Sequence, residues 1–134
     1  MITIPKYKYL DKEFLRQEAL KHFKIQLPNL SENSSEFGAY RHAYGSAILA
    51  REFGPDLARI IGAGNELSNE NWNEHLKDFY NNKIGREILG NFGSYFDNES
   101  IANSVKNAVI NGDLVFNQSD SRLDSFDGMV EYGI

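Results

Sequence analysis

The stretch from Ser34 to Phe53 reads SSEFGAYRHAYGSAILAREF, and its pattern decides the fold. On a helical wheel of about 100° per residue, small residues fall on one narrow stripe that a neighbouring helix can approach closely. These residues are Ala39, Ala43, Ser46, Ala47 and Ala50. Bulky apolar residues occupy two further faces, with Phe37, Tyr40, Tyr44 and Ile48 on one and Leu49 and Phe53 on the other. Because a helix that is apolar almost all round is buried by its neighbours, the stretch predicts a central helix.

Two polar residues interrupt this apolar pattern. Arg41 and His42 are neighbours in the sequence, and buried polar groups are costly unless they are paired or hydrogen-bonded. A lone His on an apolar helix is most often a packed, hydrogen-bonded core residue. The imidazole also titrates near neutral pH, so His42 is at the same time a candidate general acid or base.

Capping signals predict further helices on both sides of the central one. Asp11 is a suitable N-cap for a first helix that ends near Phe23, and the polar loop at residues 29–35 supplies a Ser cap to the central helix. Gly54 followed by Pro55 marks the end of the central helix and the start of a third, because Gly suits the position after a helix and Pro its first turn.

Two more helices are predicted downstream, and the ends of the chain are less regular. A fourth helix is expected from Trp72 to Leu89, ended by Gly90, and a fifth from an Asn98 cap to Asn111. We expect residues 1–134 to form a single domain, with an extended arm at 1–10 and a partly ordered, acidic tail at 117–134. Almost no stretch alternates with period two, so the predicted fold class is all-α, a compact bundle of about five helices.

Composition excludes several classes of protein. The net charge is −5, which argues against binding duplex nucleic acid, because phosphate neutralisation needs clustered Lys and Arg. The absence of cysteine excludes disulfides, thiolate zinc sites and a cysteine nucleophile. No apolar run reaches transmembrane length and residues 1–9 lack a signal-peptide pattern, so the chain as given is expected to be soluble.

The fourth helix carries a polar face opposite an apolar arc. Its members are spaced i, i+3, i+4, i+7 and i+8, namely Asp78, Asn81, Asn82, Gly85 and Arg86. The ordinary interpretation is a solvated surface. Adjacent Asn residues and a mid-helix Gly are poor helix formers, however. Residues that lower helix stability without a visible compensating interaction are expected near a functional site.

Polar groups on three predicted helices are candidates to converge on one site. The set comprises His42, Glu66, Asp78, Asn82 and Arg86, and each residue also has a structural interpretation, such as a salt bridge from Glu66 to Arg41 or Arg59. A His, carboxylates that orient it and an Arg that holds a phosphoryl oxygen would support acid–base chemistry. The same oxygen-rich set resembles a divalent-cation site, although no EF-hand spacing is present. The motifs of zinc peptidases, P-loop NTPases, α/β-hydrolases and dinucleotide-binding folds are absent.

The segments FGAYRHAYGSAILAREFG, GAGNE and DFYNNKIGREI resemble a family of small helical bacterial domains of unknown activity. Its members occur free-standing and at the C-termini of Rhs-like or polymorphic-toxin-like proteins, which implies a toxin or effector role. The resemblance covers roughly residues 35–89. It marks Arg41, His42, Glu66, Asp78, Asn81, Asn82, Gly85 and Arg86. Asn65 stands where the family is expected to carry a His beside the Glu, which argues against a metal site with two His ligands.

Two functional hypotheses follow. In the first, the domain is a toxin-type hydrolase, exported within a larger toxin system and neutralised by a cognate immunity protein. Its catalytic residues would be His42, Glu66 and Asp78, with Arg41, Asn81, Asn82 and Arg86 binding a phospholipid or a lipid-linked cell-envelope precursor. In the second, the domain is a non-catalytic helical interaction module whose polar cluster fixes helix register. A catalytic cluster should reach solvent, whereas a structural network should be sealed.

Overall fold

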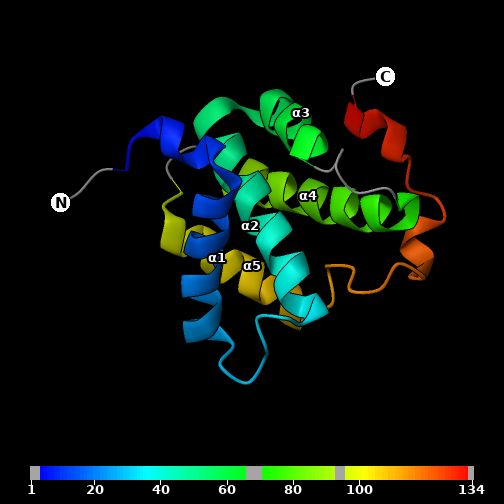
Figure 1. Ribbon diagram of the computed structural model, residues 1–134, viewed down its shortest axis with the longest axis horizontal. Coiled ribbons are helices and arrows are strands. Elements are labelled where there is room, and N and C mark those ends of the chain that lie inside the picture. The colour runs from blue at the N-terminus through cyan, green and yellow to red at the C-terminus, as the bar shows by residue number, and fades with distance from the viewer. Residues whose placement is uncertain (1–3, 66–70, 93–95, 133–134) are drawn as a thin grey trace.

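Helix α2 (Ser35–Phe53) runs through the middle of the structure and packs against every other α-helix in the described part of the chain (Figure 1). The computed structural model describes residues 4–65, 71–92 and 96–132, and no strand occurs within these ranges. The Ser34 hydroxyl accepts a hydrogen bond from the Phe37 amide at the start of α2, and Gly54 ends the helix with a φ of 90°. The predicted central helix and its caps are therefore confirmed.

The other elements of the described ranges are helical as well. In chain order they are η1 (Lys6–Leu10), α1 (Lys12–Gln26), α3 (Pro55–Asn65), α4 (Trp72–Phe92), α5 (Asn98–Ile110), η2 (Ser121–Leu123) and η3 (Gly128–Tyr132), where η denotes a 3-10 helix. Helices α1 and α5 contact each other as well as α2, and so do α3 and α4. The predicted all-α bundle around a small-residue-rich helix is confirmed.

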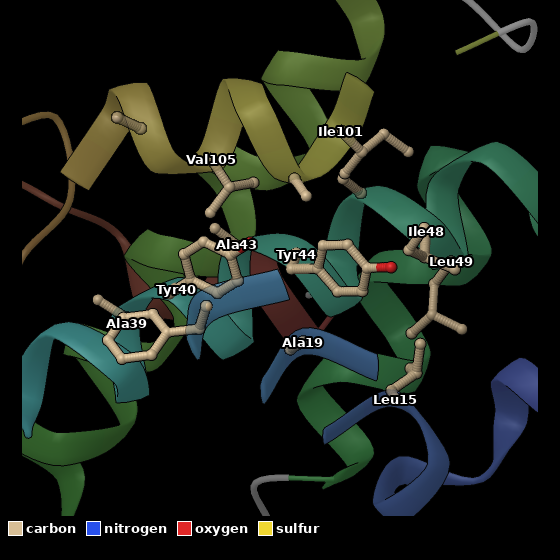
Figure 2. Close-up of a cluster of buried hydrophobic side chains, with 14 of the residues drawn as sticks. Leu15, Ala19, Ala39, Tyr40, Ala43, Tyr44, Ile48, Leu49, Ile101 and Val105 are labelled. Atoms are coloured by element: carbon tan, nitrogen blue, oxygen red, sulfur yellow. The ribbon is translucent and has the colours of Figure 1, made fainter. Parts of the chain in front are cut away.

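The core lies between α1, α2 and α5. Figure 2 shows the rings of Tyr40 and Tyr44 on α2 between Ala19 of α1 and Val105 of α5. All four side chains are fully buried. The Tyr40 hydroxyl donates a hydrogen bond of 2.7 Å to Gln26 Oε1, so its one polar atom is satisfied at the edge of the core.

Helix ends differ from the predicted ends where local signals compete. Helix α1 continues to Gln26, three residues past Phe23, although Asp11 caps it as predicted. Helix α4 runs through Gly90 to Phe92, because a Gly stops a helix only when it adopts the left-handed conformation. Helix α5 is capped by Asp97, whose carboxylate accepts a hydrogen bond from the Ser100 amide. The predicted Asn98 cap is therefore one residue too late.

The described residues near both ends of the chain include short 3-10 helices. The arm expected to be extended at 1–10 contains the 3-10 helix η1, which follows Pro5 and buries Tyr9. In the tail at 117–134, η2 lies on α4 and η3 lies on both α3 and α4 (Figure 1). Leu123 and Glu131 are buried there. The described part of the tail, residues 117–132, therefore makes long-range contacts with α3 and α4.

None of the described helices combines the length and the apolar character that a membrane crossing requires.

Candidate functional site

The polar face of α4 points into the protein. Asp78, Asn81 and Asn82 are 8%, 0% and 4% exposed, and α2 is the helix against which α4 packs most extensively. The solvated surface that such a face ordinarily indicates is therefore the wrong interpretation. The polar side chains are buried here because they have specific partners on α2 and on the segment after α5.

Gly85 is explained by packing. A Cβ atom at this position would lie 2.9 Å from the Cα atom of Ala43, so only Gly lets the backbones of α2 and α4 approach this closely. The close packing of the two helices offsets the roughly 1 kcal/mol that a Gly costs within a helix. Gly85 therefore reflects helix contact, and it does not by itself indicate a functional site.

Asn81 holds the chain that follows α5. Its Nδ2 donates to the Val115 carbonyl and its Oδ1 accepts from the Val115 amide, both at 2.8 Å. This pairing satisfies two backbone groups that would otherwise be buried without hydrogen bonds. Because both ends of the Asn81 amide are used, we leave this residue out of the candidate site, although it was predicted to bind substrate.

His42 and Asp78 form the centre of the candidate site. The His42 Nε2 atom lies 3.3 Å from Asp78 Oδ1, and each side chain is 12% exposed. Helix α2 supplies the imidazole and α4 the carboxylate, and the contact at Gly85 one to two turns further along α4 brings the two helices together. The convergence of polar side chains expected from the sequence is therefore found for His42 and Asp78.

Arg41 adds a cation to this pair. Its Nη2 atom lies 3.3 Å from the same His42 Nε2 atom. Among the described residues, no carboxylate lies within ion-pair distance of Arg41. A guanidinium can only donate and a carboxylate can only accept, so Nε2 accepts from Arg41 in one imidazole tautomer and donates to Asp78 in the other. The imidazole tautomer therefore decides which of the two contacts is a hydrogen bond.

Burial controls the protonation of His42. It lowers the pKa of the imidazole to about 4, although the nearby Asp78 charge and a hydrogen bond to the Asn82 side chain both act to raise it. Positive charge on Arg41 lowers this pKa further. The imidazole is therefore neutral at pH 7 and keeps a lone pair that can accept a proton.

A glycine on α3 makes room for Asn82. A Cβ atom on Gly62 would lie 3.1 Å from Asn82 Nδ2, which is tight contact for a side chain held in place. Helix α3 therefore closes the site from one side and fixes the amide that hydrogen-bonds His42.

Arg86 lies outside this cluster. Its Nη2 atom forms a salt bridge of 2.9 Å with Glu131 Oε2 on η3, and it lines a cavity to which neither His42 nor Asp78 contributes. The predicted constellation is thus divided along α4, because Asp78 and Arg86 are eight residues apart, or about 12 Å along a helix axis. Glu66, the third predicted catalytic residue, lies outside the described residues.

Several charged residues near Arg86 were missed by sequence reasoning. Arg59, Lys83, Arg122 and Glu131 line the same cavity, and they come from α3, α4 and the segment after α5. No local spacing links residues so far apart in the chain. The one available signal was the presence of isolated Arg residues in an acidic protein.

The sequence suggests an oxygen-rich site for a divalent cation. Within residues 4–65, 71–92 and 96–132, no group of three or more His, Asp or Glu residues is arranged to hold a metal ion. The His42–Asp78 pair alone supplies fewer ligands than a protein metal site ordinarily uses.

Comparison with known proteins assigns the chain to a family. A family described as a domain of unknown function (DUF6973) matches residues 7–113, from η1 through α5, so the chain belongs to this family. The match includes every residue of the His42 cluster and ends before the segment that carries Glu131. No curated protein and no solved structure matches the chain.

Proposed function

We propose that this domain is a hydrolase that cleaves a phosphoester in a phosphate-containing substrate, with His42 as the general base. The observation that carries the proposal is the His42–Asp78 contact of 3.3 Å between side chains that are mostly buried and still 12% exposed. Such a pair is shielded enough for strong electrostatic interactions and open enough to meet a substrate.

Each residue of the cluster has a distinct role in this reaction. The neutral His42 accepts a proton from a water molecule while the water oxygen forms a bond to phosphorus and the bond to the leaving oxygen breaks. The proton then passes from His42 to the leaving oxygen. Asp78 stabilises the imidazolium that forms, and the hydrogen bond to Asn82 orients the ring.

Arg41 is the residue best placed to bind the anionic substrate. It carries a positive charge 3.3 Å from the His42 Nε2 atom and has no carboxylate partner among the described residues. A guanidinium offers paired donors that match two phosphoryl oxygens. Arg41 therefore takes the substrate-binding role that the sequence interpretation shared among Arg41, Asn81, Asn82 and Arg86.

The biological setting we propose is that of a bacterial toxin or effector. The resemblance to C-terminal domains of Rhs-like and polymorphic-toxin-like proteins supports it, and such a domain would be exported and paired with an immunity protein. The acidic net charge of −5 favours a phospholipid or a lipid-linked envelope precursor over a polyanionic duplex.

A structural network is the second candidate function, and the burial of Asp78 and Asn82 to 8% and 4% exposure favours it. In this interpretation the cluster fixes the register of α2 on α4, and the domain acts as a non-catalytic interaction module. Removing His42 would then leave buried partners without hydrogen bonds, at roughly 1–3 kcal/mol each.

Toxicity and stability measured on the same variants separate the two functions. The domain is expressed in bacteria with and without an export signal, as wild type, His42→Ala, Asp78→Asn and His22→Ala. His22 is the matched control, because it is a partly buried His on α1 that contacts the Tyr44 ring. The hydrolase proposal expects His42→Ala and Asp78→Asn to abolish toxicity while remaining folded, and His22→Ala to stay toxic. A folded His42→Ala variant with full toxicity would rule out the base assigned here.

A further inference from the structure

A cavity of about 560 Å³ lies between α4 and the C-terminal segment, away from the His42 cluster. Four cationic side chains line it, namely Arg59 from α3, Lys83 and Arg86 from α4, and Arg122 from η2. Two carboxylates, Asp127 and Glu131, line it as well. Lys83 and Arg122 are paired with carboxylates outside the lining, Glu87 and Asp120, and Arg86 is paired with Glu131. Arg59 is the one lining cation without a carboxylate partner among the described residues.

The guanidinium of Arg86 is only partly used by the protein. Its Nη2 atom donates to Glu131 Oε2, while its Nη1 atom is buried with no hydrogen-bond partner. A buried guanidinium donor without a partner costs free energy that a bound acceptor would recover. Arg86 therefore retains the capacity for a second acceptor.

Arg59 on α3 lines the same cavity as Arg86. Its Nη1 atom donates to the main-chain carbonyls of Val130 and Glu131, at 2.8 and 3.4 Å. These carbonyls carry no net charge, so among the described residues the positive charge of Arg59 is not balanced by a carboxylate. Arg59 and Arg86 thus approach the same residue, Glu131, from two helices.

We propose that this cavity is a binding site for a phosphate monoester group, and that the Glu131 carboxylate occupies the place of phosphate oxygens when no ligand is present. A carboxylate and a phosphate present similar pairs of oxygens to an Arg fork. A bound phosphate would displace Glu131 from Arg86, accept from the buried Nη1 atom and pair with Arg59. None of His42, Asp78 and Asn82 lines the cavity, so binding here does not depend on the proposed hydrolase activity.

The phosphate group has two possible sources. The rim of the cavity includes Val130, which is 50% exposed, beside Met129, which is 45% exposed. Apolar side chains next to a basic cavity suit a lipid headgroup at a membrane surface, whereas the cavity alone suits a small soluble phosphomonoester. The chemistry at Arg59 and Arg86 is the same in both cases.

Binding is measured on the purified, folded chain with two probes at low ionic strength. Glycerol 3-phosphate is titrated calorimetrically, and vesicles of phosphatidylcholine with and without phosphatidic acid are tested by co-sedimentation. The test variants are Glu131→Gln and Arg59→Gln. Lys24→Gln is the matched control, because it also removes one positive charge, at an exposed position on α1. Circular dichroism verifies that each variant is folded, and His42→Ala is carried in parallel.

We expect Glu131→Gln to bind the probe roughly ten- to a hundredfold more tightly than wild type, because it removes a competing charge-assisted hydrogen bond. Arg59→Gln should weaken binding by about tenfold or more, while Lys24→Gln and His42→Ala bind as wild type does. Binding of glycerol 3-phosphate assigns the site to soluble phosphomonoesters, and binding only to phosphatidic acid vesicles assigns it to headgroups. Failure of both wild type and Glu131→Gln to bind either probe overturns the proposal, and so does equal weakening by Arg59→Gln and Lys24→Gln.

Discussion

The backbone of Gly85 on α4 touches the backbone of Ala43 on α2, so closely that a Cβ atom on Gly85 would lie 2.9 Å from the Ala43 Cα atom. Ala43 follows His42 directly, and Asn82 lies three residues before Gly85. This contact therefore sets the spacing between the two helices that carry the candidate site. Any substitution that forces the helices apart should also disturb the His42–Asp78 contact.

Replacing Gly85 with Ala should destabilise the fold by about 1–3 kcal/mol, as overpacking in a closely packed core does. The better helix propensity of Ala, worth up to about 1 kcal/mol, should not compensate, because the colliding atoms belong to backbone that cannot move aside. Urea denaturation measures the difference.

Gly90→Ala is the matched control on the same helix. A Cβ atom at this position meets nothing within 4 Å, so the change should stabilise the domain by about 0.5–1 kcal/mol through helix propensity alone. Equal stabilities of the Gly85→Ala and Gly90→Ala proteins would contradict the close contact between α2 and α4.

Replacing Asn81 with Ala should cost roughly 2–5 kcal/mol. The change leaves the buried amide and carbonyl of Val115 without their partners, at about 1–3 kcal/mol for each group. Thermal denaturation followed by circular dichroism gives the loss, and limited proteolysis should show earlier cleavage after α5. Asn91→Ala, an exposed position on the same helix, should change stability by less than about 0.5 kcal/mol. A loss at Asn81 no larger than at Asn91 would remove the structural role given to Asn81.

His42 should make the stability of the domain depend on pH. Its folded pKa of about 4 lies below the ordinary value of 6.5, so between these values the unfolded chain binds more protons than the folded one. Stability should therefore fall as the pH decreases from about 6.5 to about 4, by up to about 3 kcal/mol.

His42→Gln should remove this part of the pH dependence, because Gln does not titrate. Denaturation of the wild-type and His42→Gln proteins at several pH values compares their slopes, and His22→Gln corrects for a second His whose pKa burial also lowers. Parallel pH profiles for wild type and His42→Gln would show that His42 is not the group responsible.

The sequence predicted the features that are encoded locally. The apolar pattern of residues 34–53 identified the central helix, and the chemistry of Asp11, Ser34 and Gly54 identified helix ends. The contact between His42 and Asp78 was also anticipated, because small residues on α2 and α4 indicated a close approach. The central helix and the helix ends depend on residues within a few turns of one another, whereas the His42–Asp78 contact joins residues 36 positions apart and was anticipated from the small residues that let the two helices approach.

Features that depend on distant partners could not be predicted. A helical wheel ranks faces by polarity, so it indicated that the Asp78–Asn82 face was solvated, whereas Val115 and His42 supply the partners that make its burial favourable. The cavity at Arg86 was missed for the same reason, since Arg59 and Glu131 reach it from elements 27 residues before and 45 residues after Arg86. Tertiary contacts override local preference at these positions.

The ion pair between Arg86 and Glu131 should be strongly cooperative. The two side chains are 12% and 4% exposed and their charged atoms lie 2.9 Å apart. Arg86→Met alone should cost about 3–5 kcal/mol, because it leaves the Glu131 carboxylate buried without its partner. The Arg86→Met/Glu131→Met double variant should lose far less, about 1 kcal/mol or less, because apolar side chains of similar length replace both charges.

A double-mutant cycle in urea measures the coupling, which should reach at least about 2 kcal/mol. The charge pair at Lys83 and Glu87, 3.6 Å apart on the exposed side of the same helix, is the reference, and its coupling should be about 0.3–0.5 kcal/mol. A large coupling energy means that the salt bridge between Arg86 and Glu131 holds the C-terminal segment on α4, and that the contribution of each side chain depends on the other. A ligand that takes Arg86 from Glu131 would then have to stabilise the separated carboxylate or release η3 from the bundle. Coupling at Arg86 and Glu131 as weak as at the reference pair would instead show that the carboxylate can leave the cavity at little cost.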